Sequence, residues 1–208
     1  MPETPPEMLF DGPEDAPLTL ALAHGSGAPM DSPAMAHHAE GLAAQGFRVV
    51  RFEFPYMAAR RQGGKQRPPD REPRLLETWR AVIAALGPER LAIGGRSMGG
   101  RMASLLADEA GVRALVCVSY PFHPPGKPER LRTAHLEAIR TPTLIVQGTR
   151  DPFGSPEEIG GYSLSPAIRL HWSEDGDHGL KPRKASGRSE AQNWQEAEAA
   201  IAAFLAEI

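Results

Sequence analysis

Short apolar runs alternate with longer amphipathic runs along most of this chain. The expected strands are rich in apolar and β-branched residues and lie at Leu18–Ala23, Phe47–Phe52, Leu91–Gly94, Ala114–Ser119, Thr143–Gln147 and Ile168–Trp172. The expected helices have apolar residues at helical spacing and lie at Pro33–Gln45, Leu75–Leu86, Met98–Glu109 and Glu190–Ile208. Strands that alternate with helices in this way form right-handed βαβ units. The pattern predicts an α/β fold with a mostly parallel sheet of about six strands and helices on both faces.

Length and loop composition indicate one domain. A chain of 208 residues suits a single α/β domain, and no linker divides it, so residues 18–208 are assigned to that domain. Residues 1–17 hold five of the 21 prolines and no apolar periodicity, which predicts an irregular N-terminal leader. A Pro, Gly and Arg-rich loop is expected at Pro55–Pro73.

Charge and cysteine content argue against several classes of protein. The formal charge of −3 argues against DNA as the main partner. The single cysteine, Cys117, cannot form an internal disulfide or a cysteine-based zinc cluster, which fits a reducing compartment. No stretch approaches the ~20 apolar residues of a membrane helix, and the acidic, Pro-rich start does not resemble a signal peptide. We expect a cytoplasmic protein with neither nucleic acid nor a membrane as partner.

The segment Leu91–Arg101 carries the pattern G-x-S-x-G, with Ser97 at its centre, between an expected strand and an expected helix. A serine at the apex of a sharp strand-to-helix turn has a strained backbone, and glycines at Gly95 and Gly99 allow the close approach that supports it. The turn also presents the N–H of Met98 at a helix N-terminus, where an oxyanion is stabilised. The alternative is a Gly-rich turn that merely joins a strand to a helix.

A serine nucleophile needs a base, and the base needs a carboxylate that holds it in the right tautomer. Of the seven histidines, His178 is preferred because it stands in a loop beyond the last expected strand, downstream of an acid. His24 and His123 follow other strands and could line a pocket. The preferred acid is Asp151, after the strand Thr143–Gln147. Two alternatives, Asp175 and Asp177, share the loop of His178.

The loop His24–Gly27, H-G-S-G, follows the first expected strand. Its glycines tolerate unusual dihedrals, so the loop can turn backbone N–H groups inward. We expect the N–H of Ser26, or that of Gly27, to be a second oxyanion donor beside Met98. An ordinary strand-ending turn is the alternative.

With these motifs the chain resembles an α/β-hydrolase from Leu18 onward. The segments Tyr120–Pro128, Gly148–Gly154 and Asp177–Pro182 resemble a small subgroup of dienelactone-hydrolase-like proteins. The resemblance implies a catalytic triad at the serine, aspartate and histidine named above. True dienelactone hydrolases carry a cysteine nucleophile where this chain has Ser97, so their substrate is not carried over. The subgroup is also related to eukaryotic proteins that look non-catalytic, which keeps a binding module as an alternative.

Larger members of the fold insert a lid after the strand Ala114–Ser119. Here the connection Tyr120–Pro142 has 23 residues and five prolines, too little for a helical cap domain. An open or shallow pocket is expected, which favours a small acyl group over a long lipid chain. Expected lining residues are Gly27, Tyr120, Phe122, His123 and Phe153; ordinary loop packing is the alternative for the last four.

Two basic segments, residues 57–74 and 181–188, are expected to border the active-site face. They could attract an anionic substrate, but a solvated loop pair balanced by acids elsewhere is the favoured interpretation.

Together these features predict a serine hydrolase that cleaves a small ester through an acyl-enzyme, with no metal or organic cofactor. A thioesterase or peptidase of the same fold, or a binding module that uses the basic rim, are the alternatives. A dehalogenase is disfavoured because it needs an aspartate at position 97.

Overall fold

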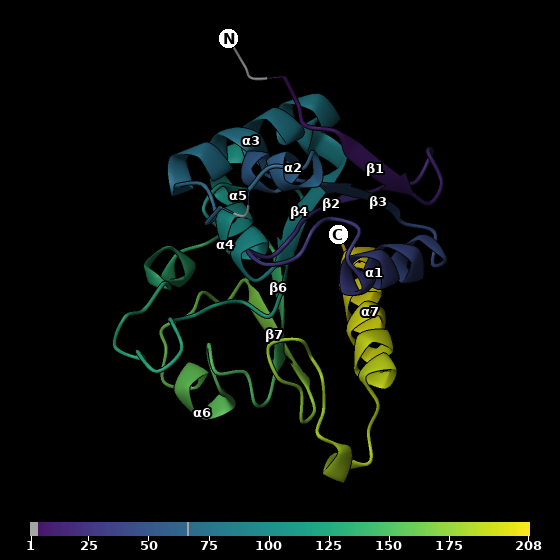
Figure 1. Ribbon diagram of the computed structural model, residues 1–208. Helices are drawn as coiled ribbons and strands as arrows, with labels where there is room; N and C mark the ends of the chain where they lie inside the picture. The colour runs from purple at the N-terminus through teal and green to yellow at the C-terminus, as the bar shows by residue number, and fades with distance from the viewer. Residues whose placement is uncertain (1–3, 66) are drawn as a thin grey trace.

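A seven-stranded sheet forms the centre of the computed structural model, which describes residues 4–65 and 67–208 (Figure 1). The strands are β1 (Met8–Asp11), β2 (Thr19–Ala23), β3 (Arg48–Phe52), β4 (Leu91–Arg96), β5 (Ala114–Val118), β6 (Thr143–Gly148) and β7 (Ile168–Ser173). Their order across the sheet is β1-β3-β2-β4-β5-β6-β7. All neighbouring pairs are parallel except β1 with β3. The α/β fold with a mostly parallel sheet is therefore confirmed.

The N-terminal segment differs from the expected irregular leader. Met8–Asp11 forms β1 and pairs antiparallel with β3, so that Met8 lies opposite Phe52. This four-residue edge strand is held mainly by its partner, because none of its residues is fully buried. A strand that depends on pairing with a distant segment leaves little trace in its own sequence. The first three residues of the expected leader lie outside the described residues.

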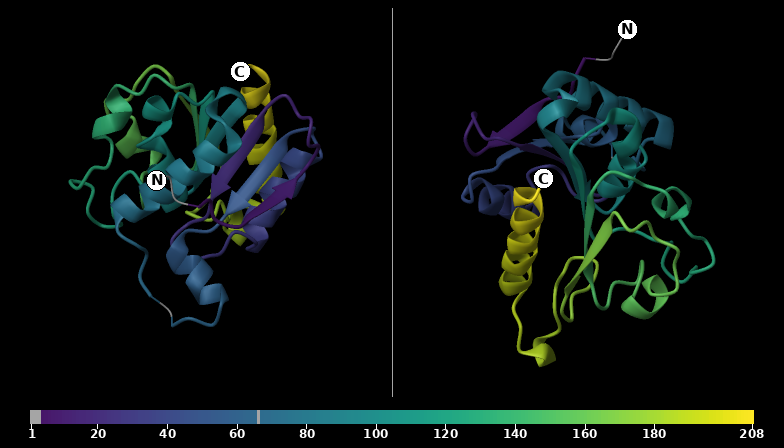
Figure 2. Two further views of the ribbon diagram at one scale, coloured as in Figure 1. Left: turned by 90° about the horizontal axis from the view of Figure 1, so that it is seen from above. Right: turned by 180° about the vertical axis from the view of Figure 1, so that it is seen from behind.

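Helices cover both faces of the sheet (Figure 2). On one face lie α1 (Pro33–Ala43) and α7 (Glu190–Ala206); on the other lie α2 (Pro55–Arg61), α3 (Glu72–Leu86), α4 (Met98–Ser104) and α5 (Ala107–Ala110). Successive residues of β2 alternate between two cores. Leu20 and Leu22 pack toward α1 and α7, whereas Ala21 and Ala23 pack toward α3 and α4. This alternation follows from the period of two in a strand and makes both faces of the sheet apolar.

Two expectations about where helices form were wrong in detail. The segment Pro55–Pro73 was expected to be a loop, but Pro55–Arg61 forms α2, with Pro55 at a first helical position where its missing N–H costs no hydrogen bond. The single helix expected at Met98–Glu109 is interrupted at Leu105 and Leu106, where α4 ends before α5 begins. Among residues 4–65 and 67–208, no helix is long and apolar enough to cross a membrane.

The connection between β5 and β6 carries no cap domain. Its one regular element is the short 3-10 turn η2 (Ala134–Glu137). The remaining short elements are α6 (Pro156–Ile159), η1 (Pro88–Arg90) and η3 (Lys184–Ser186). The segments that follow β5 and β6 are therefore mostly coil, with α6 as the labelled helix at the lower left of Figure 1.

The strand order reverses between β2 and β4. The chain passes from β2 to β3 on one side, then returns to place β4 on the other side of β2. Loops that leave two such neighbouring strands diverge to opposite faces of the sheet and leave a crevice between them. In this protein the two loops are His24–Gly27 after β2 and the turn at Ser97 after β4.

Candidate active site

Ser97 occupies a strained turn between β4 and α4. Its backbone has φ 50° and ψ −115°, a conformation that residues other than glycine rarely adopt. The turn lies directly against the end of β2: a Cβ on Gly95 would lie 2.2 Å from the carbonyl oxygen of Ala23, and one on Gly99 would lie 2.4 Å from the same oxygen. Only glycine fits at these two positions, which is the physical reason for the G-x-S-x-G pattern.

Three side chains form a hydrogen-bonded series at this turn. The Nε2 atom of His178 lies 2.9 Å from Oγ of Ser97, and its Nδ1 atom lies 2.8 Å from Oδ2 of Asp151. The three residues are far apart in the sequence, but each stands at or beyond the carboxyl end of a strand: β4, β6 and β7 respectively. Parallel strands bring those ends to one edge of the sheet. The structure thus brings the predicted nucleophile, base and acid into contact.

Asp151 is enclosed by hydrogen-bond donors. Its side chain is fully buried, and the backbone N–H of Phe153 donates to Oδ1 at 2.9 Å. The Nε2 group of Gln147 donates to Oδ2 at 3.0 Å. Both donors stabilise the ionised carboxylate and hold its oxygens toward His178. Sequence reasoning missed Gln147, although a polar residue directly after the apolar run Leu144–Val146 of β6 was a usable signal.

The alternative acids have other partners. Asp175 forms ion pairs with Arg183 and with Arg150, at 3.0 Å for the latter, and these arginines lower the pKa of Asp175 to about 2. Asp177 accepts the backbone N–H groups of Gly179 and Lys181 through Oδ1, at 2.7 and 3.0 Å. Asp177 thus shapes the loop that carries the histidine, while Asp151 contacts its ring.

Two side chains hold the loop His24–Gly27 in place. The backbone N–H of Phe54 donates to Nε2 of His24 at 3.1 Å, so Nδ1 carries the proton and donates to the carbonyl of Gly25 at 2.7 Å. Burial lowers the pKa of His24, which keeps the ring neutral in this role. The hydroxyl of Tyr56, whose pKa burial raises to about 12, donates to the carbonyl of Ser26 at 3.1 Å. Both carbonyls are therefore fixed from behind the loop.

The two expected oxyanion donors lie beside the serine. Met98 is the first residue of α4, where a backbone N–H has no acceptor within the helix. Ser26 borders the same depression as Met98, Ser97 and His178. The loop is in close contact with the turn, since a Cβ on Gly25 would lie 3.8 Å from Cβ of Ser97.

Two open depressions flank Ser97 and His178. One, of about 160 Å³, is bordered by Gly27, Met35 and Arg96. The other, of about 350 Å³, is bordered by Met98, Arg101, Pro121, Arg132 and Phe153. The ring of Phe153 stacks on that of His178, with centroids 4.1 Å apart. Of the expected lining residues, Gly27 and Phe153 are therefore placed at the site.

The structure places the other expected lining residues elsewhere. Tyr120 and Phe122 are fully buried in the core that packs on α3 and α4, and the hydroxyl of Tyr120 donates to the carbonyl of Arg132. His123 is also buried and lies 3.3 Å from the carboxylate of Glu158. None of the three borders the two depressions. The rings of Tyr120 and Phe122 instead pack on each other within this core, with centroids 4.8 Å apart.

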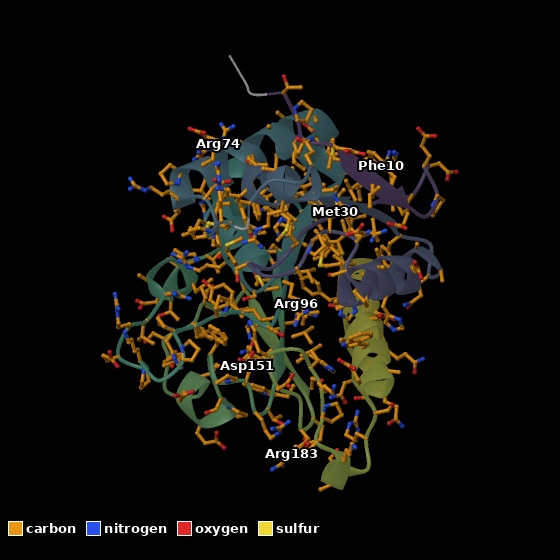
Figure 3. All side chains as sticks on the ribbon, viewed as in Figure 1. Phe10, Met30, Arg74, Arg96, Asp151 and Arg183 are labelled. Carbon is orange, nitrogen blue, oxygen red and sulfur yellow. The ribbon has the colours of Figure 1, made fainter. Side chains whose placement is uncertain are left out.

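The basic segments contribute little to the surface around Ser97. Arg61, from residues 57–74, pairs with Asp31 and Glu53, and Arg183, from residues 181–188, pairs with Asp175. Figure 3 shows Arg183 well away from Arg96. The arginines that do border the depressions are Arg96, Arg101 and Arg132, and Arg132 was missed because nothing in its local sequence marks it.

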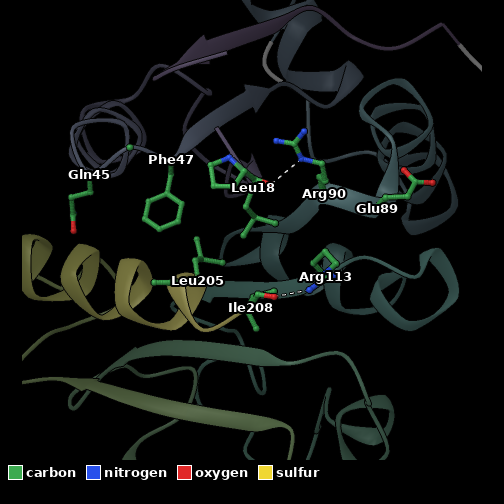
Figure 4. A pocket seen from close by; sticks show the side chains of 11 residues that line it. Leu18, Gln45, Phe47, Glu89, Arg90, Arg113, Leu205 and Ile208 are labelled. Atoms are coloured by element: carbon green, nitrogen blue, oxygen red, sulfur yellow. Dashed lines mark hydrogen bonds between the residues drawn. The ribbon is translucent and has the colours of Figure 1, made fainter. Parts of the chain in front are cut away.

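A separate pocket of about 440 Å³ lies at the amino ends of the parallel strands, on the opposite side of the sheet from the carboxyl ends that carry Ser97 (Figure 4). Leu18, Phe47, Leu205 and Ile208 give it an apolar lining, and Arg113 donates to the carbonyl of Ile208 beside it. The first two of these residues immediately precede parallel strands, whereas Ser97 follows one. No residue that lines this pocket is a histidine, serine or cysteine, so it does not offer the chemistry of the Ser97 site.

The sheet order, the serine turn and the open carboxyl edge together define the α/β-hydrolase class. A family model for the alpha/beta hydrolase domain matches residues 16–206. The chain belongs to this family.

Solved structures show the same fold. An alpha-beta serine hydrolase homologue from Coxiella burnetii is 18% identical, with a TM-score of 0.71 over 94% of this chain and 89% of that chain. An a/b serine hydrolase without lid from Xanthomonas campestris is 19% identical, with a TM-score of 0.69 over 93% and 87%. Est1E from Butyrivibrio proteoclasticus, with ferulic acid bound, is 14% identical, with a TM-score of 0.71 over 97% and 94%.

Proposed function

We propose that the protein is a serine hydrolase that cleaves small carboxylic esters through an acyl-enzyme. The observation that carries the proposal is the unbroken hydrogen-bonded series from Oγ of Ser97 through the His178 ring to the buried Asp151. A serine hydroxyl is a weak nucleophile until a base removes its proton, and this arrangement supplies the base and its orienting carboxylate.

The first half of the reaction acylates Ser97. Its Oγ attacks the ester carbonyl carbon while Nε2 of His178 takes the hydroxyl proton, and the carbonyl π electrons move to oxygen. The N–H groups of Met98 and Ser26 stabilise that oxyanion. The intermediate then collapses, the carbon–oxygen bond to the alcohol breaks, and His178 gives its proton to the departing oxygen.

The second half hydrolyses the acyl-enzyme. His178 takes a proton from water, whose oxygen attacks the acyl carbon, and collapse of this intermediate releases the carboxylic acid and returns the proton to Ser97. Asp151 stays ionised throughout and stabilises the imidazolium that forms in each half.

Within the family, we place the chain in the dienelactone-hydrolase-like subgroup with a serine nucleophile. The segments Tyr120–Pro128, Gly148–Gly154 and Asp177–Pro182 support this placement through their resemblance to that subgroup. Similarity to a solved esterase domain supports esterase activity. That domain, from a Rhodothermus marinus protein, is 18% identical, with a TM-score of 0.65 over 94% of this chain and 89% of that chain.

Covalent labelling tests the proposal directly. A fluorophosphonate probe is expected to label the wild-type protein and to leave Ser97→Ala unlabelled, because only an activated serine reacts at a useful rate. Ser186→Ala is the matched control, since its exposed hydroxyl donates to the carbonyl of Arg183 and accepts the backbone N–H of Arg188, away from Ser97 and His178. Labelling that persists in Ser97→Ala, or that is absent from the wild type, would contradict the proposal and favour a binding module.

Acyl chain length provides a second test. Each methylene buried in a tunnel would raise kcat/KM by about fourfold, the equivalent of ~0.8 kcal/mol. Here the two depressions are small and no cap covers them, so longer chains gain no such burial. We expect kcat/KM for 4-nitrophenyl esters to be highest for short acyl groups and to stay level or fall beyond butyrate. A continued rise toward long chains would refute an open site.

The same assay, run with matched compounds, identifies the leaving group that the enzyme prefers. An oxygen ester, a thioester and an amide of one short acid share the acyl-enzyme and differ only in the bond that breaks. We expect the ester to have the highest kcat/KM. Preference for the thioester or the amide would reassign the reaction within the same mechanism.

A further inference from the structure

The loop that carries His178, residues 174–180, has an unusual backbone. This His178 loop follows β7 directly, and its residues Asp175 and Leu180 have positive φ angles of 52° and 62°. A leucine rarely adopts this left-handed conformation, so contacts from outside the loop are needed to stabilise it. The position of the His178 ring depends on those contacts.

Each backbone carbonyl of the His178 loop accepts a hydrogen bond. Some of the donors lie outside α7: Leu180, Arg150 and Arg96 donate to the carbonyls of Asp177, of Asp175 and Gly176, and of His178, respectively. The other carbonyls accept hydrogen bonds from two neighbouring side chains near the start of α7. The N-terminal end of this helix is therefore part of the support of the catalytic base.

Asn193 joins the two ends of the His178 loop. Its Nδ2 group donates to the carbonyl of Glu174 at 3.0 Å and to that of Leu180 at 2.7 Å, and the residue is fully buried. The Nε group of Arg188 donates to Oδ1 of Asn193 at 2.8 Å, which turns the NH₂ group toward the loop. Both hydrogens of that group are then used. One amide thus fixes the distance between the chain segments on either side of His178.

Trp194 supports the same loop closer to the histidine. Its indole N–H donates to the carbonyl of Gly179, the residue after His178, at 3.3 Å. The indole ring packs against the ring of His37 in α1, with centroids 5.0 Å apart. Adjacent residues of α7 therefore bind the loop before and after its histidine.

Helix packing alone does not explain an amide at position 193. α7 packs on the sheet through apolar side chains such as Ile201 and Phe204, and an apolar residue at 193 would extend that contact. Burial of an amide costs free energy unless its hydrogen bonds are made. At Asn193 they are made to the His178 loop and to Arg188.

We propose that Asn193 is a positioning residue: by joining the ends of the His178 loop, it holds Nε2 of His178 at hydrogen-bond distance from Oγ of Ser97. This role rests on the proposed hydrolase function. The distance between these two atoms is 2.9 Å, and a misplacement of about 1 Å can lower the rate about 100-fold. Asn193 borders neither depression beside Ser97, so substrate binding does not use it.

Asn193→Asp tests the proposal. The substitution keeps the size of the side chain and the oxygen that accepts Arg188, but it replaces the NH₂ group by an oxygen that repels the two carbonyls. Both halves of the reaction use His178, so we expect kcat for a short 4-nitrophenyl ester to fall about 10- to 100-fold, with KM within about twofold of the wild type. The rate of fluorophosphonate labelling is expected to fall by a similar factor.

Leu205→Ala is the control for a loss of stability alone. Leu205 is buried at the other end of α7, beside the pocket at the amino ends of the strands. Its truncation leaves a cavity and is expected to lower the unfolding temperature at least as much as Asn193→Asp, with kcat within about twofold of the wild type. If Asn193→Asp does not fold, as judged by circular dichroism, Asn193→Ala removes the same donor without adding a charge and carries the same expectation.

Three results would overturn the proposal. They are a kcat within about twofold of the wild type in the folded Asn193 variant, a loss that lies in KM, and an equal loss of kcat in Leu205→Ala.

Failure of the hydrolase function gives a different result, because the wild type is then neither labelled nor active. Amide hydrogen exchange of residues 174–180 becomes the readout, since local opening of a loop is measured without catalysis. Faster exchange there in Asn193→Asp, but not in Leu205→Ala, would support the support of the loop by Asn193 without a catalytic role. Exchange at the wild-type rate in Asn193→Asp would overturn it.

Discussion

Replacing Ser97 by alanine is expected to lower kcat for an activated short-chain ester by about 10⁴-fold or more. The substitution removes the only hydroxyl within hydrogen-bond distance of Nε2 of His178 among the described residues. Binding should change little, because the depressions on both sides keep their other lining residues. Stopped assays with purified protein, run beside a buffer blank, measure the loss.

Folding provides the control for this loss. Alanine at position 97 carries the same backbone strain as serine, so thermal unfolding is expected at nearly the wild-type temperature. A variant that unfolds normally and has no activity places the chemistry on the hydroxyl. Retention of more than about a tenth of the wild-type kcat would show that another group is the nucleophile.

Replacing Asp151 by asparagine is expected to lower kcat by about 10⁴-fold. The structure explains why an amide cannot substitute here. Oδ1 accepts the N–H of Phe153 and Oδ2 accepts the NH₂ group of Gln147, so either orientation of the new NH₂ group faces another donor. The amide also cannot stabilise an imidazolium. Initial rates across the pH range, with circular dichroism to verify folding, would measure the effect.

Asp177→Asn is the matched comparison for this prediction. Asp177 accepts two backbone N–H groups through a single oxygen, Oδ1, and an asparagine oxygen can accept both. We expect a loss of less than about tenfold in kcat, because the contact between His178 and Asp151 is made without this side chain. A larger loss for Asp177→Asn than for Asp151→Asn would reassign the acid.

Most of the fold could be predicted because its signals are local. The six parallel strands are dominated by apolar and β-branched residues, and each is bounded by turn residues. The edge strand Met8–Asp11 could not be predicted, since it depends on pairing with β3. The break between α4 and α5 was also hidden, because Leu105 and Leu106 continue the apolar pattern of the helix.

The residues of the candidate site also fall into those that local sequence signals could predict and those that they could not. Ser97, Asp151 and His178 could be placed together because each follows a strand, and the topology brings those strand ends to one edge. Tyr120 and His123 also follow a strand, but their side chains turn into the core, which depends on how the next twenty residues pack. Arg132 needed the three-dimensional path of that connection.

The contact between the serine turn and β2 fixes the position of Ser97 relative to the loop His24–Gly27. Gly95 and Gly99 press against the carbonyl of Ala23, the residue immediately before the loop His24–Gly27. The spacing between the nucleophile and the loop is thus set by two backbones in direct contact, with no side chain between them. Substitutions at surface and pocket residues leave this contact unchanged, so we expect them to alter substrate preference without displacing Ser97 from the loop.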